Sequence, residues 1–396
     1  MASDPADPKF WDFEESILAP AKLNLFFQTF PKEPGSSGLH QVRSLITPCS
    51  LTDTIQVKVN WHQGAPFSVR IRLADPSPDH SVDSDHSVDS DHSVDSDHSI
   101  DADHSRVSEP PLGPDLPLGP ENLLWQAAAA WWEAWQGKQG TFAPQIDLIL
   151  SKNIPWAAGL GGGSSDAAAL LRILQTQLPY PVSEEKMARN ICPDLGSDVY
   201  PAYLRQMLAV DDTGHRIASL YAFSQPILPP SCLLLTFPDI HFSTPLFYGK
   251  LDALAERGGA DALLSNSFAP LSLEAFPPLA KLLQELIAFA KEESLTCRSG
   301  RDFWQYLQAQ SHHLLVREKI LDESWTLPEI SLSQDFWSGL WDQGDLYLDL
   351  SGTGPTIFLL YAPRHGEAIA RLAAHLQELA ARLQVKMGIH WTQLLL

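Results

Sequence analysis

A glycine-rich segment in the middle of the chain has the composition of a phosphate-binding loop. Its four glycines allow backbone amides to converge on an anion without obstruction from side chains. An expected strand at residues 146–150 precedes it and an expected helix begins at Ser164, whose unpaired amides and positive end favour phosphate. We therefore predict a site for the triphosphate of a nucleotide, with Ser164 or Ser165 as a ligand of magnesium. The segment is Pro155-Trp156-Ala157-Ala158-Gly159-Leu160-Gly161-Gly162-Gly163-Ser164-Ser165-Asp166.

This loop differs from two common nucleotide-binding motifs. A P-loop of the form G-x-x-x-x-G-K-[ST] needs a lysine before the hydroxyl residue, and the loop has none. It also lacks the strand-first G-x-G-x-x-G pattern of dinucleotide-binding folds. The glycines alone leave open a second interpretation, a tight connection between a strand and a helix.

Two further segments carry polar groups suited to proton transfer. In Pro20-Ala21-Lys22-Leu23-Asn24-Leu25-Phe26, Lys22 and Asn24 share one face of an expected strand because side chains alternate with a period of two. Asp198 lies in Gly196-Ser197-Asp198-Val199, a short loop after an expected helix at residues 184–192. An exposed edge strand and a helix cap are the respective alternatives for these two segments.

The elements that must position these groups indicate an α+β protein of two domains. Strands are expected within residues 17–63, and a helix rich in tryptophan, whose tryptophans belong to the core, at residues 121–136. We place the domain boundary between residues 228 and 229, before an apolar strand at residues 232–237. Residues 298–345 show no clear period. Later expectations are helices near 246–257, 271–292 and 366–383 and strands at 347–350 and 356–361.

Residues from about 64 to 120 differ in character from the rest of the chain. The hexad Ser-Val-Asp-Ser-Asp-His recurs with variation from Ser81 to His104, and nine aspartates fall between Asp79 and Asp103. A segment with so little to bury cannot offset its ordering entropy, so we predict a disordered acidic insertion. We prefer a tolerated surface expansion as its explanation. Zinc or nickel binding is the alternative, through the histidines His80, His86, His92, His98 and His104.

The charge and cysteine content exclude several classes of function. The chain has 48 acidic against 27 basic residues and a formal net charge of -21, which leaves no basic stripe for nucleic acid or anionic lipid. No secretory signal pattern and no apolar run of the ~20 residues that a membrane helix needs are visible. We expect a cytoplasmic protein with a small-molecule substrate; the sequence does not indicate its oligomeric state. The cysteines are far apart and lack C-x-x-C spacing: Cys49, Cys192, Cys232 and Cys297.

Four segments together resemble the GHMP kinase superfamily, in which they occur in the same order. They are Pro-Ala-Lys-Leu-Asn-Leu, Pro-x-x-x-Gly-Leu-Gly-Gly-Gly-Ser-Ser, Gly-Ser-Asp-Val and Ser-Gly-Thr-Gly-Pro-Thr. Together with Gly38-Leu39-His40, they resemble the kinases of 4-diphosphocytidyl-2-C-methyl-D-erythritol within it. The resemblance runs in patches from about Ile17 to the C-terminal helix. It implies ATP-dependent phosphorylation of the 2-hydroxyl of this alcohol, in the non-mevalonate route to isoprenoids.

The resemblance also implies a fold and a set of roles. The fold would be a two-domain GHMP kinase fold, with an N-terminal ribosomal S5 domain 2-like domain and a C-terminal ferredoxin-like domain. Asp198 would accept the hydroxyl proton, Lys22 would keep Asp198 ionised and Asn24 would orient the alcohol. The cytidine contacts would come from His40, Thr244 and Tyr248, and turn 351–356 would close the site. ATP, with Mg²⁺, would be bound by Asn122, Pro155, Gly159, Leu160, Gly161, Gly162, Gly163, Ser164 and Ser165.

Several positions depart from the pattern of these kinases and leave two alternatives open. Leu39 and Ile46 stand where aromatic residues are common, residues 266–269 replace an Asn-Asp-Leu-Glu segment, and residues 205–209 replace a glycine-rich strand. The chain could act on mevalonate, homoserine or a sugar instead, since the same fold serves those kinases. It could also be a non-catalytic protein derived from a kinase, which the intact Lys22, Asp198 and glycine loop oppose.

Overall fold

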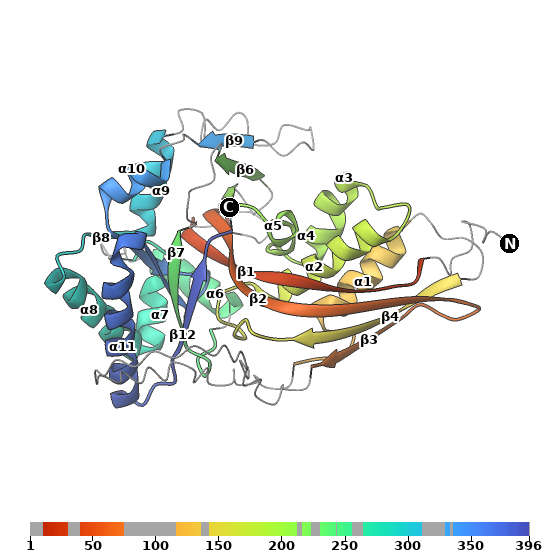
Figure 1. The fold of residues 1–396 in the computed structure, drawn as a ribbon, viewed down its shortest axis with the longest axis horizontal. Coiled ribbons are helices and arrows are strands. Elements are labelled where there is room, and N and C mark those ends of the chain that lie inside the picture. Colours follow the sequence, from red (N-terminus) through yellow and green to blue (C-terminus); the bar gives the residue numbers. More distant parts are fainter. Residues whose placement is uncertain are drawn as a thin grey trace, which may run out of the picture.

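Two β-sheets and the helices on them organise the described part of the chain (Figure 1). The computed structural model describes residues 11–30, 40–74, 116–135, 142–211, 216–222, 230–242, 244–255, 264–310, 329–332 and 336–395. The hexad repeat with its histidines, and Leu39, lie outside these residues. No helix in the described ranges is both long and apolar enough to cross a membrane.

The first sheet has the order β3-β4-β2-β5-β6-β9, with β1 paired to β2. Residues 54–59 show why strands form here, because Ile55, Val57 and Val59 are fully buried while Gln56 and Lys58 on the opposite face are exposed. The antiparallel pairing of β1 with β2 is irregular next to Lys22 and Asn24. The strands are β1 (Phe13–Thr29), β2 (Val42–Gln63), β3 (Ser68–Leu73), β4 (Phe142–Ser151), β5 (Leu208–Asp211), β6 (Arg216–Ala222) and β9 (Glu329–Leu332).

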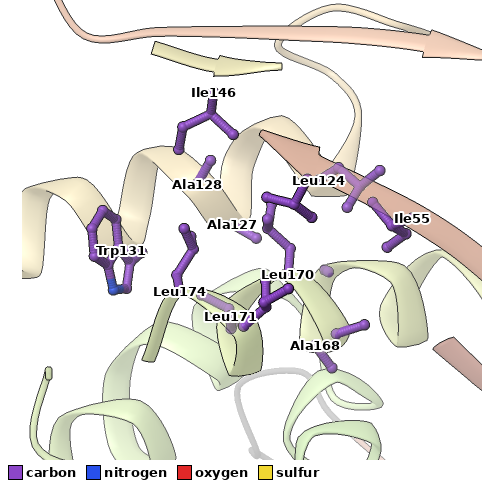
Figure 2. Packing of buried hydrophobic residues seen from close by; sticks show 14 of the residues in the cluster. Ile55, Leu124, Ala127, Ala128, Trp131, Ile146, Ala168, Leu170, Leu171 and Leu174 are labelled. Atoms are coloured by element: carbon purple, nitrogen blue, oxygen red, sulfur yellow. The ribbon is translucent and has the colours of Figure 1, made fainter. Parts of the chain in front are cut away.

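Helices cover one face of this sheet and bury its apolar residues. Figure 2 shows Ile55 near Leu124 of α1 and Ile146 near Ala128 of α1, in one cluster with Leu170 of α2, all of them almost fully buried. The predicted tryptophan-rich helix is confirmed as α1, and Trp131 and its neighbour Trp135 are core residues, although Trp125 and Trp132 are only partly buried. The helical segments are α1 (Leu123–Ala134), α2 (Gly162–Gln177), α3 (Glu184–Lys186), the π-helical η2 (Met187–Ile191), α4 (Cys192–Leu195) and α5 (Val199–Leu204).

The second sheet has the order β12-β7-β11-β10-β8. Its first four strands pair in antiparallel fashion, and their order relative to the chain is that of a ferredoxin-like split βαβ unit, as predicted. The strands are β7 (Ser231–Thr236), β8 (Cys297–Ser299), β10 (Leu346–Leu350), β11 (Ile357–Tyr361) and β12 (Gly388–Gln393). The helices of this part are α6 (Thr244–Ala255), α7 (Ala269–Ala275), α8 (Pro277–Glu292), the 3-10 turn η3 (Pro363–His365) and α11 (Gly366–Arg382).

The two sheets share a buried cluster, which we call the shared core. It joins Leu23 and Leu25 of β1 to Leu234 of β7, Phe358 of β11 and Trp304 of α9 (Gly300–Gln310). Residues 298–345, which showed no clear period, supply much of it through α9 and α10 (Phe336–Gln343). In it Phe26 of β1 stacks on Trp304 with ring centroids 5.1 Å apart. The helix α9 therefore supports the strand that carries Lys22 and Asn24.

Two predicted boundaries differ from the structure. Strand β3 lies inside the predicted insertion of residues 64–120 and pairs with β4 in parallel, because Val69 and Ile71 continue an alternating apolar pattern beyond the turn at Gly64. Strand β9 lies beyond the predicted domain boundary at 228/229 but pairs with β6 of the first sheet. The boundary therefore does not separate the two sheets completely.

Candidate active site

The glycine loop has a backbone that only glycine accommodates at two positions. Gly159 (φ 77°) and Gly161 (φ 66°) adopt left-handed conformations. A Cβ atom at Gly159 would collide with the backbone carbonyl of Ser351, and one at Gly161 would lie 2.8 Å from Cγ of Lys22. Helix α2 begins at Gly162, two residues before the predicted start, and no side chain caps it. Its first-turn amides therefore face the loop as an anion site.

The remaining loop residues differ in how they can serve a phosphate. The side chain of Leu160 is buried, and its carbonyl accepts the backbone N–H of Lys22 at 2.9 Å, so only the Leu160 backbone faces the site. Ser165 is also buried, and its Oγ donates to the carbonyl of Pro20 at 2.6 Å. Ser164 is partly exposed. Of the two predicted magnesium ligands, Ser164 is thus the better placed, and the assignment stays a prediction.

Lys22, Asn24 and Asp198 come together at one end of a cavity, although about 175 residues separate the strand from the loop. The Lys22 Nζ atom lies 3.4 Å from Oδ2 of Asp198 and donates to Oδ1 of Asn24 at 2.5 Å. Asn24 in turn donates from Nδ2 to Oγ of Ser44 at 2.8 Å. Each of these three side chains is therefore held by a neighbouring side chain, and all three line the same cavity.

The surroundings of Asp198 bear on the two predicted roles of its carboxylate, a general base and a helix cap. Asp198 precedes α5, but its side chain makes no capping hydrogen bond. Its carboxylate is 37% exposed, whereas the Lys22 side chain is 10% exposed. A carboxylate that is open to the cavity and paired with a nearly buried ammonium has the geometry of a general base.

The cavity has a volume of about 710 Å³, within the usual size of small-molecule sites. The ring of His40 stacks on Tyr248 with centroids 4.7 Å apart, and His40 Nδ1 bonds the carbonyl of Phe30 at 3.2 Å. Burial, together with the nearby Asp198 carboxylate, raises the pKa of Tyr248 to about 12, so its hydroxyl stays protonated. Ile46, noted in the sequence as a departure, lies in an apolar part of the lining together with Val42, Val210 and Phe268, which the sequence did not indicate. The predicted residues that line the cavity are Lys22, Asn24, His40, Gly159, Gly161, Asp198, Thr244 and Tyr248.

Other predicted contacts lie outside that lining. Asn122 is buried and caps helix α1, accepting the N–H of Leu124 at 2.8 Å while its Nδ2 donates to Pro117 at 2.6 Å. Its assignment to adenine stays a prediction. The predicted ATP contacts outside the cavity lining, apart from Asn122, are Pro155, Leu160, Gly162, Gly163, Ser164 and Ser165.

A buried ionic cluster at the base of the glycine loop escaped the sequence reasoning. Lys152, just before the loop, donates to Oδ2 of Asp53 and lies 2.9 Å from Oδ2 of Asp166. The other oxygen of Asp53 accepts the backbone N–H groups of Asn153 and Ile154 at 2.6 and 2.8 Å. Lys152 therefore joins the two ends of the loop, and Asp53 fixes the first end. We call Lys152, Asp53 and Asp166 the loop cluster. The sequence gives no sign that the segment beginning at Lys152 pairs with Asp53, which lies 99 positions earlier.

The loop cluster contains two carboxylates and one ammonium, so one proton neutralises it. Burial is the main effect that raises the pKa of Asp166 to about 8, and the neighbouring Asp53 adds to it, against the opposing pull of Lys152. Burial acts to lower the pKa of Lys152, but the two carboxylates outweigh it and leave that pKa raised. Near neutral pH, Asp166 is thus largely protonated while Lys152 pairs with Asp53.

Replacing Asp166 with Asn should make the protein less sensitive to alkaline pH. The raised pKa means that the stability contributed by protonated Asp166 is complete near pH 4 and is lost as the pH rises through about 8. An amide keeps that neutral state at every pH. The melting temperature of D166N, measured by calorimetry between about pH 5 and 9, should therefore exceed that of the parent by an amount that grows as the pH rises. Asp147→Asn, which alters a surface pair with Arg70, is the control, and parallel curves for D166N and the parent would contradict this account.

Comparison with known proteins places this site in a family. The family model for the GHMP kinases N terminal domain matches residues 122–206, which include the glycine loop and Asp198. The 4-diphosphocytidyl-2-C-methyl-D-erythritol kinase of Thermus thermophilus is 30% identical over 354 residues, covering 85% of this chain and 98% of the relative. The enzyme of the same name from Pelobacter propionicus is 29% identical over 250 residues, covering 63% of this chain and 70% of the relative.

A solved structure agrees with the sequence relatives on the fold. The crystal structure of a 4-(cytidine 5'-diphospho)-2C-methyl-D-erythritol kinase superposes with a TM-score of 0.50 at 23% identity, over 96% of this chain and 99% of that one. It supports the two-domain α+β architecture. Because the Thermus relative is matched along almost its whole length, the chain belongs to the 4-diphosphocytidyl-2-C-methyl-D-erythritol kinase family of the GHMP kinases.

Proposed function

We propose that this chain transfers the γ-phosphate of ATP to the 2-hydroxyl of 4-diphosphocytidyl-2-C-methyl-D-erythritol and so forms the 2-phosphate, a step of the non-mevalonate route to isoprenoid precursors. The observation that carries the proposal is the Lys22–Asp198 pair, 3.4 Å apart in a cavity that Gly159 and Gly161 also line. An acid–base pair and an anion site thus open into the same space. The names of the matched relatives support the choice of alcohol.

The reaction follows from the positions of these groups. Asp198 accepts the proton of the alcohol as its oxygen attacks the γ-phosphorus, and the partly exposed carboxylate is open to that oxygen. Lys22 keeps Asp198 ionised and stabilises the negative charge that develops. Asn24, fixed by Ser44 and Lys22, orients the alcohol. Phosphoryl transfer requires mainly positioning and charge neutralisation, so the chain needs no covalent intermediate.

The loop and helix α2 hold the triphosphate in this proposal, with magnesium as its counter-ion. The described residues contain no group of three His, Cys, Asp or Glu side chains that could hold a metal by themselves. Magnesium usually takes one or two protein oxygens, phosphate oxygens and water, and the partly exposed Ser164 fits that pattern. Bound there, the ion would neutralise phosphate charge during transfer.

The nucleoside end of the acceptor would lie against His40 and Tyr248, which also line the cavity. Tyr248 and His40 provide a stacked aromatic surface, and Thr244 lies beside the turn that closes the site, its Oγ1 3.3 Å from Oγ1 of Thr353. Ile46 and Val210 supply aliphatic surface to the same cavity. Kinases of this kind commonly have an aromatic residue at the position of Ile46. We propose a cytoplasmic setting, which suits the free thiols of all four cysteines.

The test is ATP-dependent phosphorylation by the purified chain with magnesium. The cytidyl alcohol, mevalonate, homoserine and galactose are offered separately and then in competition, and the products are identified by ³¹P NMR. Turnover of the cytidyl alcohol alone establishes the proposal. Preferential turnover of another alcohol would keep the GHMP kinase chemistry and overturn the substrate, whereas no turnover with any of them would favour a non-catalytic binding protein.

A further inference from the structure

A buried carboxylate behind the cavity has no part in the proposed proton transfer. Asp349, in strand β10, is fully buried. Its Oδ2 accepts the backbone N–H of Ser265 at 3.0 Å and also the Ser265 hydroxyl, while its Oδ1 accepts the backbone N–H groups of Asn266 at 3.1 Å and Leu350 at 2.9 Å. Both oxygens are therefore engaged by donors, and Asp349 fixes the backbone of residues 265–266.

The next link runs from Asn266 to the turn at the cavity. Asn266 is 2% exposed, and its Nδ2 donates to the carbonyls of Leu350 and Gly352, both at 2.8 Å. Its Oδ1 accepts the backbone N–H of Phe268 at 2.8 Å, so its amide group has a single orientation. Asp349 holds Asn266, and Asn266 holds residues 351–354, which we call the closing turn.

The closing turn contacts the catalytic groups directly. The hydroxyl of Ser351 donates to the carbonyl of Gly159 at 3.1 Å and lies 3.3 Å from the backbone nitrogen of Asn24. At Gly352, a Cβ atom would lie 3.3 Å from Nζ of Lys22 and 3.4 Å from Oδ1 of Asn24. The turn therefore touches both the glycine loop and the Lys22–Asn24 pair, and a small displacement of it would change their relative positions.

We propose that Asp349 is a positioning residue whose ionised carboxylate, acting through Asn266, holds the closing turn against Lys22, Asn24 and the glycine loop. This inference rests on the proposed kinase function. It adds a residue that lies outside the cavity lining and explains why the Asn266 side chain is retained although the residues after it differ from the usual Asn-Asp-Leu-Glu pattern. The carboxylate matters as the acceptor, because an amide at position 349 accepts on one oxygen only.

The surroundings of Asp349 favour its ionised form only above mildly acidic pH. The groups that face Asp349 among the described residues are not titratable: they are Ser265 and Asn266 before α7, Leu350 of β10 and Gly300 at the start of α9. Burial raises its pKa to about 6, against the hydrogen bonds that lower it. As the pH falls through this value, Asp349 becomes protonated, and the added proton meets the groups of Ser265 or Asn266 that donate to the carboxylate. These hydrogen bonds weaken, and the closing turn is held less firmly.

The test compares three single variants and one double variant. Asp349→Asn should reduce kcat about 10- to 100-fold, since a misplacement of about 1 Å can cost 10²-fold, while KM for ATP changes less than about threefold. The parent should lose kcat as the pH falls through about 6, and D349N should lack this loss. Asn266→Ala should reproduce the kcat defect, and D349N/N266A should be no worse than either single variant because both break one connection. Asp302→Asn, which alters a carboxylate at the start of α9 that bonds Ser299, is the matched control.

Hydrogen exchange gives a readout that needs no substrate. Amides of residues 351–354 should exchange faster in D349N and N266A than in the parent or D302N, while strands β7 and β11 keep their protection. The proposal would be overturned if D349N kept the kcat of the parent and the same fall of kcat below about pH 6. It would also be overturned if amide exchange became faster over the whole second sheet. If D349N does not fold, N266A carries the same two measurements. If the proposed function is wrong, the parent protein itself will show no turnover. The hydrogen-exchange comparison would still test the role of Asp349 in that case.

Discussion

Asp198→Asn should lower kcat by about 10²- to 10⁴-fold, the usual contribution of a general base. The amide cannot take the proton of the attacking hydroxyl, and it leaves Lys22 without its anionic partner 3.4 Å away. ATP affinity should change little, because the glycine loop and the first turn of α2 do not depend on this carboxylate. Turnover is measured at saturating substrates, and nucleotide affinity by calorimetry with a non-hydrolysable ATP analogue.

The control for this variant is a carboxylate nearby on the same segment. Asp194 lies in α4, four residues before Asp198, and is exposed. Asp194→Asn should keep parental kcat, whereas Lys22→Ala should fall by a factor similar to that of Asp198→Asn. Near-normal turnover in D198N would remove Asp198 from its role as base and leave the Lys22–Asp198 pair as a structural contact.

Lys152→Met should destabilise the fold more than any single surface substitution, by about 3–5 kcal/mol in the free energy of unfolding near neutral pH. Methionine matches the length of the lysine stem but leaves the Asp53 carboxylate buried without its counter-ion, beside an Asp166 that is largely protonated near neutral pH. Domains are stable by only about 5–15 kcal/mol, so the loss is a large fraction of the total. Urea unfolding gives this free energy, and KM for ATP should rise as well, because Lys152 joins the two ends of the glycine loop.

Lowering the pH should rescue this variant in part, which distinguishes a charge effect from a packing effect. Loss of Lys152 removes the attraction that lowers the pKa of Asp166, so Asp166 stays protonated to higher pH in the variant than in the parent. The deficit relative to the parent should therefore shrink as the pH falls from about 9 to 7. Lys58→Met is the matched control, because Lys58 pairs with Glu14 at 3.0 Å on the surface, where ion pairs contribute about 0–1 kcal/mol. A K152M deficit equal to that of K58M, or one independent of pH, would contradict the charge argument.

Local segments of the site could be predicted from the sequence because their chemistry depends on neighbouring residues. The glycines, Lys22 with Asn24, and Asp198 each lie in a short run whose residue types indicate a function. The cavity lining contains these groups together, apart from the loop residues that follow Gly161. The cytidine contacts of His40 and Tyr248 stay predictions, although the two rings do meet.

The remaining site features depend on packing between distant parts of the chain. Lys152 and Asp53 are separated by 99 positions, and Ser265 and Asp349 by 84, so no local pattern pairs them. Strand β9 could not be assigned to the first sheet, since its four residues carry no period and its partner β6 lies more than a hundred positions earlier. Asn122 caps α1, a role that the sequence reasoning did not assign although side chains at helix starts commonly accept backbone N–H groups, and its adenine contact stays a prediction.

The shared core restricts how substrates can reach the cavity. A rigid-body opening of the two sheets would expose Leu23, Leu25, Leu234 and Phe358 to water at a cost of about 25 cal/mol for each Å² of apolar surface. Such a motion would also separate the hydroxyl of Thr392 in β12 from that of Ser50 in β2, which lie 3.0 Å apart. Entry and product release should therefore rely on small movements of α6, which carries Thr244 and Tyr248 of the cavity lining, while the closing turn and the two sheets stay fixed through the catalytic cycle.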